Sequence, residues 1–379
     1  MFRFIADEWQ RLWRDKWLLA SITWVPILLA VSLWWIFSQG IARALPIAVV
    51  DHQQSRLSHE LVRYLDASET LHVSTHFQSE YDAKRALSGS DIYAYVVIPR
   101  DFDRDIFLSN PPQVSVFYNS QYILVGKLVN SSVLRSVGTF DAKIQTAKKL
   151  ASGNSTIKSA LGKAVTVRTQ ITPLFNSNSN YAQFLVSAIV PAVWQIVIVV
   201  GTVLTLAMHK RLGTMDKWLE QGVVGAMTKT LACYIPIYWA LGVGFLLWFY
   251  AYLQWPMQGG YAVLIFAQFA TVLACTLVGA VFFFMTFDAA RALSFAGAFT
   301  APGFAFMGIT FPVTDMGTLA QGWRSLLPIS HYIEAQVSQV SYGASTLQTL
   351  GFLVPMLGYL VLLLVLAKLA PKKIKGALA

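Results

Sequence analysis

The chain has 379 residues, of which 55% are hydrophobic and only 13% are charged. Soluble domains carry roughly 25% charged residues, so much of this chain is expected to face lipid. The formal net charge of +10 falls mostly in short segments beside apolar stretches. This distribution argues against nucleic-acid binding as the reason for the positive charge. It favours a membrane protein whose orientation is set by those basic residues.

Residues 1–17 are predicted to form an amphipathic helix in the cytoplasmic membrane interface. Arg3, Asp7, Arg11 and Arg14 occupy the faces that the apolar residues leave free. A plain N-terminal extension of the first membrane span is the alternative. The apolar residues recur at helical spacing: Phe2, Ile5, Trp9, Leu12, Trp13 and Trp17.

The uncharged stretch that follows predicts a first transmembrane helix at 18–37. The basic start, the apolar run and Ala42-Arg43-Ala44 also fit a cleaved signal peptide. The apolar run, however, is as long as the roughly 20 residues that a span needs, against roughly 7–15 in a signal peptide. It also contains Trp24, Trp34 and Trp35, so we expect an uncleaved helix.

Residues 41–180 alternate between strand and helix patterns, which predicts a small α/β domain. The part from 152 to 180 is polar and less regular. The segments that read as strands are 46–51, 71–77, 92–98 and 113–118.

Five further uncharged stretches predict transmembrane helices. The helix at 292–311 is expected to be irregular, because Pro302, Gly303, Gly308 and Pro312 interrupt it. The segment 312–346 that follows is either a re-entrant helix or a plain external loop. The five predicted helices lie at 182–208, 231–253, 261–287, 292–311 and 347–367.

Short basic segments place both termini in the cytoplasm. These segments precede 18–37, follow 182–208 and form the tail at 368–379. The predicted fold is therefore an α-helical integral membrane protein of six transmembrane helices. Its large external α/β domain, residues 41–180, is inserted between the first and second helices, and a cytoplasmic segment occupies 209–230.

No catalytic motif is found. Gly126-Lys127 and Gly162-Lys163 lack the remaining residues of a nucleotide-binding loop, so we expect no cofactor on this chain and no metal site. Gln195 and Gln268 are the most polar residues in the middle of the predicted spans. They line a path or bond between helices, and the sequence leaves both readings open.

The layout resembles the bacterial ABC transporter permeases of the ABC-2 type over nearly the whole chain. Val97-Ile98-Pro99-Arg100-Asp101-Phe102 is similar to a turn of the family's external domain, and Gly213-Thr214-Met215-Asp216 is similar to its Gly-Thr-x-Glu segment. Gly308-Ile309-Thr310-Phe311-Pro312, with the later His331-Tyr332, resembles its last external stretch. The family usually has acidic residues just before Gly-Thr, where this chain has His209-Lys210-Arg211-Leu212.

The resemblance implies an exporter subunit of the bacterial inner membrane, energised by a separate cytoplasmic ABC ATPase dimer that binds ATP. It further implies a second permease copy or a homologous permease, and a periplasmic membrane-fusion adaptor as an optional partner. The residues expected to couple to the ATPase are Arg211, Gly213, Thr214, Asp216 and Lys217. The residues expected to contact a hydrophobic or amphipathic substrate are Trp194, Gln195, Phe304 and Phe306.

Two other functions fit the same layout. An ion-coupled secondary transporter would normally carry acidic or histidine side chains within its spans, and the predicted spans contain none. A membrane anchor whose external domain binds a partner, without transport, is the second alternative.

Overall fold

The structure is a computed structural model that describes residues 2–38, 40, 43–108, 110–151, 175–176, 180–219 and 222–378. The chain divides into two compact units. The helical unit consists of Met1–Gly40 and Pro173–Ala379, and the inserted unit consists of Ile41–Thr172.

Within the described residues, five helices are long and apolar enough to cross a membrane. They match five of the six predicted spans and confirm that the chain is built for multiple membrane passes. The five are Lys16–Phe37, Tyr181–Arg211, Gly225–Tyr252, Tyr261–Thr286 and Thr346–Lys372.

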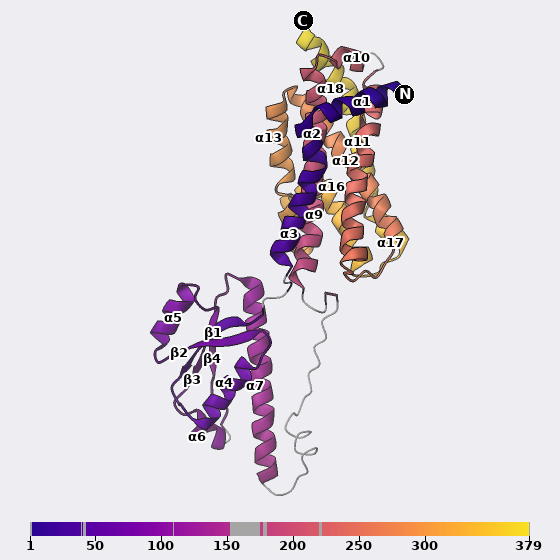
Figure 1. Ribbon diagram of the computed structural model, residues 1–379. Coiled ribbons are helices and arrows are strands. Elements are labelled where there is room, and N and C mark those ends of the chain that lie inside the picture. The colour runs from indigo at the N-terminus through magenta and orange to yellow at the C-terminus, as the bar shows by residue number, and fades with distance from the viewer. Residues whose placement is uncertain are drawn as a thin grey trace. The chain divides into compact units, whose positions relative to one another are not determined.

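The helical unit is shown in Figure 1, where α9 and α12 lie at its centre. Its N-terminal part comprises α1 (Phe2–Arg14), α2 (Lys16–Ile22), α3 (Trp24–Phe37), α9 (Tyr181–Arg211), α10 (Met215–Leu219), α11 (Val223–Leu247), a π-helical turn η1 (Trp248–Tyr252) and α12 (Tyr261–Thr286). The remainder comprises α13 (Ala289–Thr300), α14 (Gly303–Phe306), η2 (Val313–Asp315), α15 (Thr318–Ser325), α16 (Pro328–Val340), α17 (Thr346–Gly351), η3 (Val354–Leu360) and α18 (Val361–Leu378).

The predicted span at 292–311 differs from the structure. It is divided between α13, which has 12 residues, and α14, which has four. The helix ends because Pro302 has no N–H to donate, and Gly303 follows it. A helix of 12 residues rises only about 18 Å, so α13 is too short to cross the roughly 30 Å of a bilayer core.

A second short helix, α16, lies between the middle of α9 and the end of the unit where α12 begins. Near its start, the N–H of Ile329 donates to Gln195 Oε1 at 2.9 Å, and Gln195 lies about 21 Å along α9 from Tyr181. At its end, the carbonyl of Val340 accepts from Gln258 N at 3.1 Å, beside the start of α12. Residues 289–340 thus run between the two ends of the unit through α13, α14, η2, α15 and α16, of which α13 and α16 are the two longest.

The inserted unit is attached at one end of the helical unit. Tyr181 N, at the start of α9, donates to Gly40 O, just after α3, at 2.7 Å. The chain therefore leaves for the inserted unit and returns from it at the same place. The opposite end of the helical unit holds α1, α10 and the end of α18 (Figure 1).

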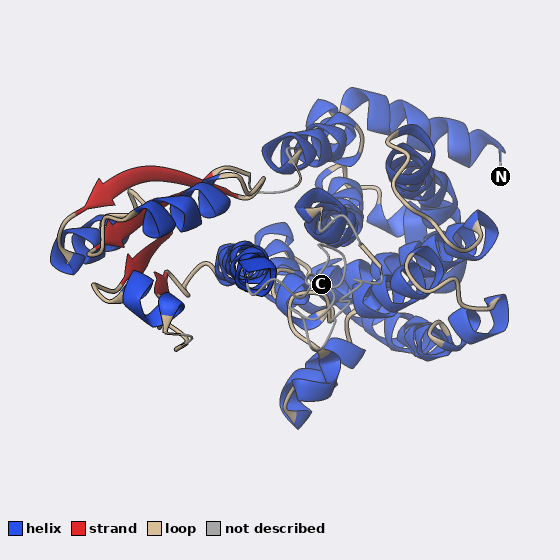
Figure 2. Cartoon of the chain, turned by 90° about the horizontal axis from the view of Figure 1, so that it is seen from below, coloured by secondary structure: helices blue, strands red, loops and turns tan. Residues whose placement is uncertain are grey.

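The inserted unit is an α/β layer, as the sequence predicts (Figure 2). Its four-stranded sheet has the order β2-β1-β3-β4, with β1 parallel to β2 and β3, and β4 antiparallel to β3. The elements are β1 (Leu45–Asp51), α4 (Arg56–Asp66), β2 (Leu71–Phe77), α5 (Glu80–Ser88), β3 (Ala94–Ile98), α6 (Phe102–Phe107), β4 (Ser115–Tyr118) and α7 (Ile123–Ala151).

Alternate residues of β1 pack on the two faces of this sheet, because neighbouring side chains of a strand point to opposite sides. Ile47 and Val49 pack with residues of α4 and α7, whereas Ala48 and Val50 pack with α5. All four predicted strands are confirmed within two residues of their bounds. Most of the predicted polar stretch at 152–180 lies outside the described residues.

Candidate functional site

A buried carboxylate joins α1 to the end of α9. Glu8 is only 1% exposed. Its Oε1 lies 3.0 Å from His209 Nε2 and accepts a hydrogen bond from Tyr234 OH at 3.2 Å, while its Oε2 accepts from Arg11 Nη1 at 3.2 Å. One side chain thus ties together α1, α9 and α11.

The pKa of Glu8 is set by these neighbours. Burial alone raises the pKa of this carboxyl, but the hydrogen bond and charge of His209, the charge of Arg11 and the hydrogen bond from Tyr234 outweigh burial. Together they hold the pKa of Glu8 below its ordinary value of 4.5. A carboxyl of depressed pKa stabilises the fold fully above its unfolded pKa and loses that contribution as pH falls through its folded pKa.

We therefore expect acid to weaken the wild-type protein more than a Glu8→Gln variant. The difference in free energy of unfolding between the two should be largest above about pH 4.5 and should shrink as the pH falls below it. Thermal unfolding of the purified proteins across a pH series measures this difference. A difference that does not change with pH would show that the charge of Glu8 contributes nothing.

The segment after α9 folds back onto the same histidine. Gly213 has φ +63°, in the left-handed region, where the chain reverses direction. Thr214 N then donates to His209 O at 3.0 Å, and Thr214 Oγ1 lies 3.1 Å from His209 Nδ1. The two ring nitrogens of His209 therefore join Thr214, a predicted coupling residue, to Glu8 of α1.

A Gly213→Val substitution is expected to destabilise this turn. The left-handed conformation costs an L-residue roughly 1–2 kcal/mol, whereas asparagine tolerates it better, so Gly213→Asn should be milder. A Cβ atom at Gly213 would meet no atom within 4 Å, so the backbone alone causes the effect. Equal melting temperatures for the two variants would mean that the left-handed turn is not needed.

The remaining predicted coupling residues differ in how they are held. Arg211 Nη2 lies 2.5 Å from Asp15 Oδ2, which makes a second link from the end of α9 to the junction of α1 and α2. Lys217 is exposed on α10. The side chain of Asp216 lies outside the described residues.

α10 is anchored by Trp218, which packs against α11 and α12. Trp218 is buried, and its Nε1 donates to Thr230 Oγ1 of α11 at 2.8 Å. Its ring lies 5.7 Å from that of Phe284 of α12. α10 is therefore in contact with α11 and α12 as well as with α9.

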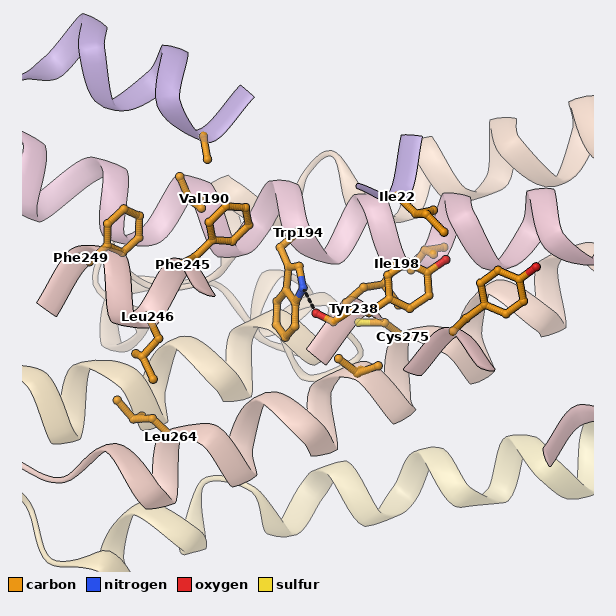
Figure 3. Packing of buried hydrophobic residues seen from close by; sticks show 14 of the residues in the cluster. Ile22, Val190, Trp194, Ile198, Tyr238, Phe245, Leu246, Phe249, Leu264 and Cys275 are labelled. Carbon is orange, nitrogen blue, oxygen red and sulfur yellow. Dashed lines mark hydrogen bonds between the residues drawn. The ribbon is translucent and has the colours of Figure 1, made fainter. Parts of the chain in front are cut away.

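Trp194, a predicted substrate-path residue, packs inside this chain. Its Nε1 donates to Tyr238 O of α11 at 2.8 Å, as the dashed line in Figure 3 shows. The cavity beside it measures about 10 Å³, which is room for about one water molecule. Among the described residues, this cavity at Trp194 is too small for a substrate, and the contact of Trp194 with substrate stays a prediction.

Gln195 and Gln268 both bond between helices. Gln195 Oε1 accepts from Ile329 N of α16. Gln268 Nε2 donates to Gly242 O of α11 at 2.9 Å and to Tyr332 OH of α16 at 3.0 Å. The sequence left open whether these two glutamines line a path or bond between helices, and in the structure they form bonds between helices.

Phe304 and Phe306 lie on α14, close to Gln195. Both are half-buried and pack against the apolar cluster that includes Ala188 and Ala192 of α9. A Cβ atom placed on the neighbouring Gly303 would lie 3.5 Å from Gln195 Nε2. The structure thus places α14, which carries Phe304 and Phe306, beside Gln195, whereas Trp194 hydrogen-bonds α11 and has its ring 5.9 Å from that of Tyr332 of α16.

The contact residues that the sequence analysis missed are Glu8, Tyr234 and His209. Glu8 follows Ile5 by three residues and precedes Leu12 by four, so it lies on an apolar face of α1. An acidic residue in that position requires a buried partner, and this was the available signal. No comparable signal marks Tyr234, because it lies in the stretch of α11 after Thr230 that contains no charged residue.

The arrangement can transmit a displacement. The described residues include no group of three His, Cys, Asp or Glu side chains placed to hold a metal ion. Instead, α9 is a continuous helix of 31 residues, held at His209 by Glu8 and near its middle by the bond from Gln195 to α16. A shift of α1 or α10 would reach the middle of the unit through this helix.

Comparison with known proteins adds one relationship. The sequence model of a family described as ABC-2 family transporter protein matches residues 16–369. No curated protein and no solved structure matches the chain.

Proposed function

The chain belongs to the ABC-2 family of transporter membrane proteins, and on that premise we propose that it is the permease subunit of an ATP-driven exporter. It is a multi-pass membrane protein, and membrane subunits of this family generally work with separate ATPase subunits. In our proposal a cytoplasmic ABC ATPase dimer supplies the energy to a homodimer of this chain or to its pair with a homologous permease. The substrate is hydrophobic or amphipathic.

The buried link between α1 and the Gly213 turn carries this proposal. An ATPase has to push on parts of the permease that move together, and Glu8, His209 and Thr214 join two surface segments into one body. Gly213 and Lys217 remain exposed at that end of the helical unit for a partner to contact. ATP-driven closure would displace this body and, through α9, the contact of Gln195 with α16.

The proposed orientation places this end in the cytoplasm of a bacterial inner membrane. Basic residues favour the cytoplasmic side, and the described ones at this end include Arg11, Arg14, Lys210 and Arg211. The inserted unit, attached at the opposite end, is then external. There it would act in release of the substrate or dock a periplasmic adaptor.

We propose that α13 and α16 together make the fifth membrane crossing, the one predicted at 292–311. The hydrogen bond from Ile329 to Gln195 supports this, because it lies about 21 Å from the start of α9, well within a bilayer core of roughly 30 Å. The segment 312–346, in this reading, returns to membrane depth. Irregular backbone is tolerated at that depth where protein buries it or where it lines a cavity.

The exposed apolar residues of α15 support a partner at this depth. Leu319 is 90% exposed, and Leu326 and Trp323 are also exposed. We propose that a second permease copy faces this region and that the substrate passes between the copies. Phe304 and Phe306 on the preceding α14 would then lie close to the path.

Co-purification tests the proposal. The tagged chain, expressed with the ABC ATPases of the same cell, is expected to retain one of them and to form a complex that hydrolyses ATP. Replacing the phosphate-binding lysine of that ATPase should abolish both hydrolysis and export from cells. If no ATPase binds and a proton gradient alone drives export, the chain is a secondary transporter. If a partner binds the inserted unit and no export occurs, the chain is an anchor.

A further inference from the structure

An apolar groove opens on the side of the helical unit between the first and third spans. It measures about 540 Å³, within the range of roughly 300–1,000 Å³ that is typical of small-molecule sites. One wall is formed by α2 and α3, including Ile27 and Val31, and the other by α11, including Leu241 and Gly244. Both walls belong to helices that are long and apolar enough to cross a membrane.

Irregular backbone bounds the groove on both walls. The helix of the first span breaks at Thr23, where α2 gives way to α3 with φ −120° and ψ −86°. On the other wall, α11 passes into the π-helical turn that begins at Trp248. The hydroxyl of Thr23 donates to Leu19 O at 2.6 Å, so the indole N–H of Trp248 is the one other polar group among the lining side chains.

The length of the groove matches one leaflet of a bilayer. From Ile22 to Val31 one wall extends about 14 Å, and from Ile237 to Trp248 the other extends about 16 Å, at 1.5 Å per residue. Half of a bilayer core of roughly 30 Å is about 15 Å. A single acyl chain reaches over that depth.

Aromatic residues mark the headgroup level at one end. Trp35 and Tyr252 are 75% and 78% exposed, and the rings of Trp34 and Trp248 meet edge to face at 5.7 Å. Tryptophan and tyrosine gather at the membrane–water interface. These four residues lie at the end of the helical unit to which the inserted unit is attached, so the groove extends inward from that interface.

We propose that the groove is a binding site for one acyl chain of a bilayer phospholipid, from the leaflet on the side of the inserted unit. Acyl chains surround these walls in the membrane, and an unfilled apolar groove would leave its lining without contact partners. The bound chain fills the space between α3 and α11 as a structural component of the subunit. This inference requires only that the two walls span a membrane, and it holds whether or not the chain is an exporter.

Filling the groove with protein tests the proposal. A Cβ atom at Gly244 meets nothing within 4 Å, so Gly244→Trp places its ring in the groove without a backbone clash. The matched control is Gly358→Trp, on an exposed position of the last candidate span that is equally open and away from the groove. Full-length protein is reconstituted in nanodiscs that contain a phosphatidylethanolamine with a diazirine halfway along one acyl chain.

Photolysis and peptide mapping give the result. We expect the wild type and Gly358→Trp to be labelled more strongly at residues 22–31 and 237–248 than at the lipid-facing part of α18. In Gly244→Trp, the groove labelling should fall to the α18 level. Removal of phospholipid by detergent should also lower the melting temperature of the wild type more than that of Gly244→Trp. Groove labelling no stronger than that of α18, or equal in all three proteins, would overturn the proposal.

Discussion

Replacing Glu8 with alanine is expected to disconnect the ATPase from the membrane helices. The substitution leaves His209 Nε2 and Tyr234 OH without their shared acceptor. Leaving a buried hydrogen-bonding group without its partner typically costs about 1–3 kcal/mol, so the melting temperature should fall. Coupling energies between sites are typically about 1–3 kcal/mol, so the stimulation of ATP hydrolysis by the permease should fall about fivefold or more.

Two matched variants test whether the effect depends on the charge of Glu8 and on its position in α1. Glu8→Gln keeps the shape of the side chain and should retain part of the coupling. Asp7→Ala removes a neighbouring acidic residue that is exposed on the same helix, and it should leave both stability and ATP hydrolysis unchanged. If Glu8→Ala loses stability and yet couples like the wild type, the buried link holds the fold together without transmitting force.

Gly279→Ala is expected to separate the two central helices. A Cβ atom at Gly279 of α12 would lie 2.7 Å from the carbonyl oxygen of Val199 and 3.0 Å from Thr202 Cβ, both on α9. The first of these neighbours is backbone, so it cannot move aside without shifting the helix. Overpacking of this kind typically costs about 1–3 kcal/mol, measured as a lower melting temperature of the purified subunit.

Gly297→Ala on α13 is the control for this substitution. A Cβ atom at Gly297 meets no atom within 4 Å, and alanine favours a helix over glycine by roughly 0.5–1 kcal/mol. Its melting temperature should therefore stay the same or rise. If Gly279→Ala behaves like Gly297→Ala, α9 and α12 do not approach each other as closely as described.

The sequence predicts the elements that depend on local composition. Uncharged stretches locate five spans, and alternation of apolar residues locates the four strands of the inserted unit. The span at 292–311, expected to be irregular because of Pro302 and Gly303, is divided into the two shorter helices α13 and α14. In our proposal α16 shares this crossing, and the pattern alone does not reveal it because the polar residues of α16, such as Gln336 and Gln339, are buried by tertiary contacts.

The candidate site depends even more on contacts between distant residues. Family resemblance directs attention to Gly213 and Thr214, but Glu8, which is joined to Thr214 only through His209, lies about 200 positions earlier in the chain. Likewise, Trp194 and Gln195 are adjacent in sequence, but Trp194 hydrogen-bonds α11 and packs its ring against Tyr332 of α16, whereas Gln195 accepts from the backbone of α16. Which side of α9 each residue faces becomes apparent only once the neighbouring helices are placed.

The sidedness of the Gly213 segment is the most direct test of the proposed mechanism, because a cytoplasmic ATPase has to reach it. Single cysteines replace Lys217 on α10 and Asp82 in the inserted unit, both exposed positions, in a chain whose own buried Cys233 and Cys275 are changed to serine. A membrane-impermeant maleimide is applied to spheroplasts before and after permeabilisation. We predict that the cysteine at 82 reacts in intact spheroplasts and that the cysteine at 217 reacts only after permeabilisation. Labelling of the cysteine at 217 in intact spheroplasts would place the Gly213 segment outside the cell and contradict the mechanism.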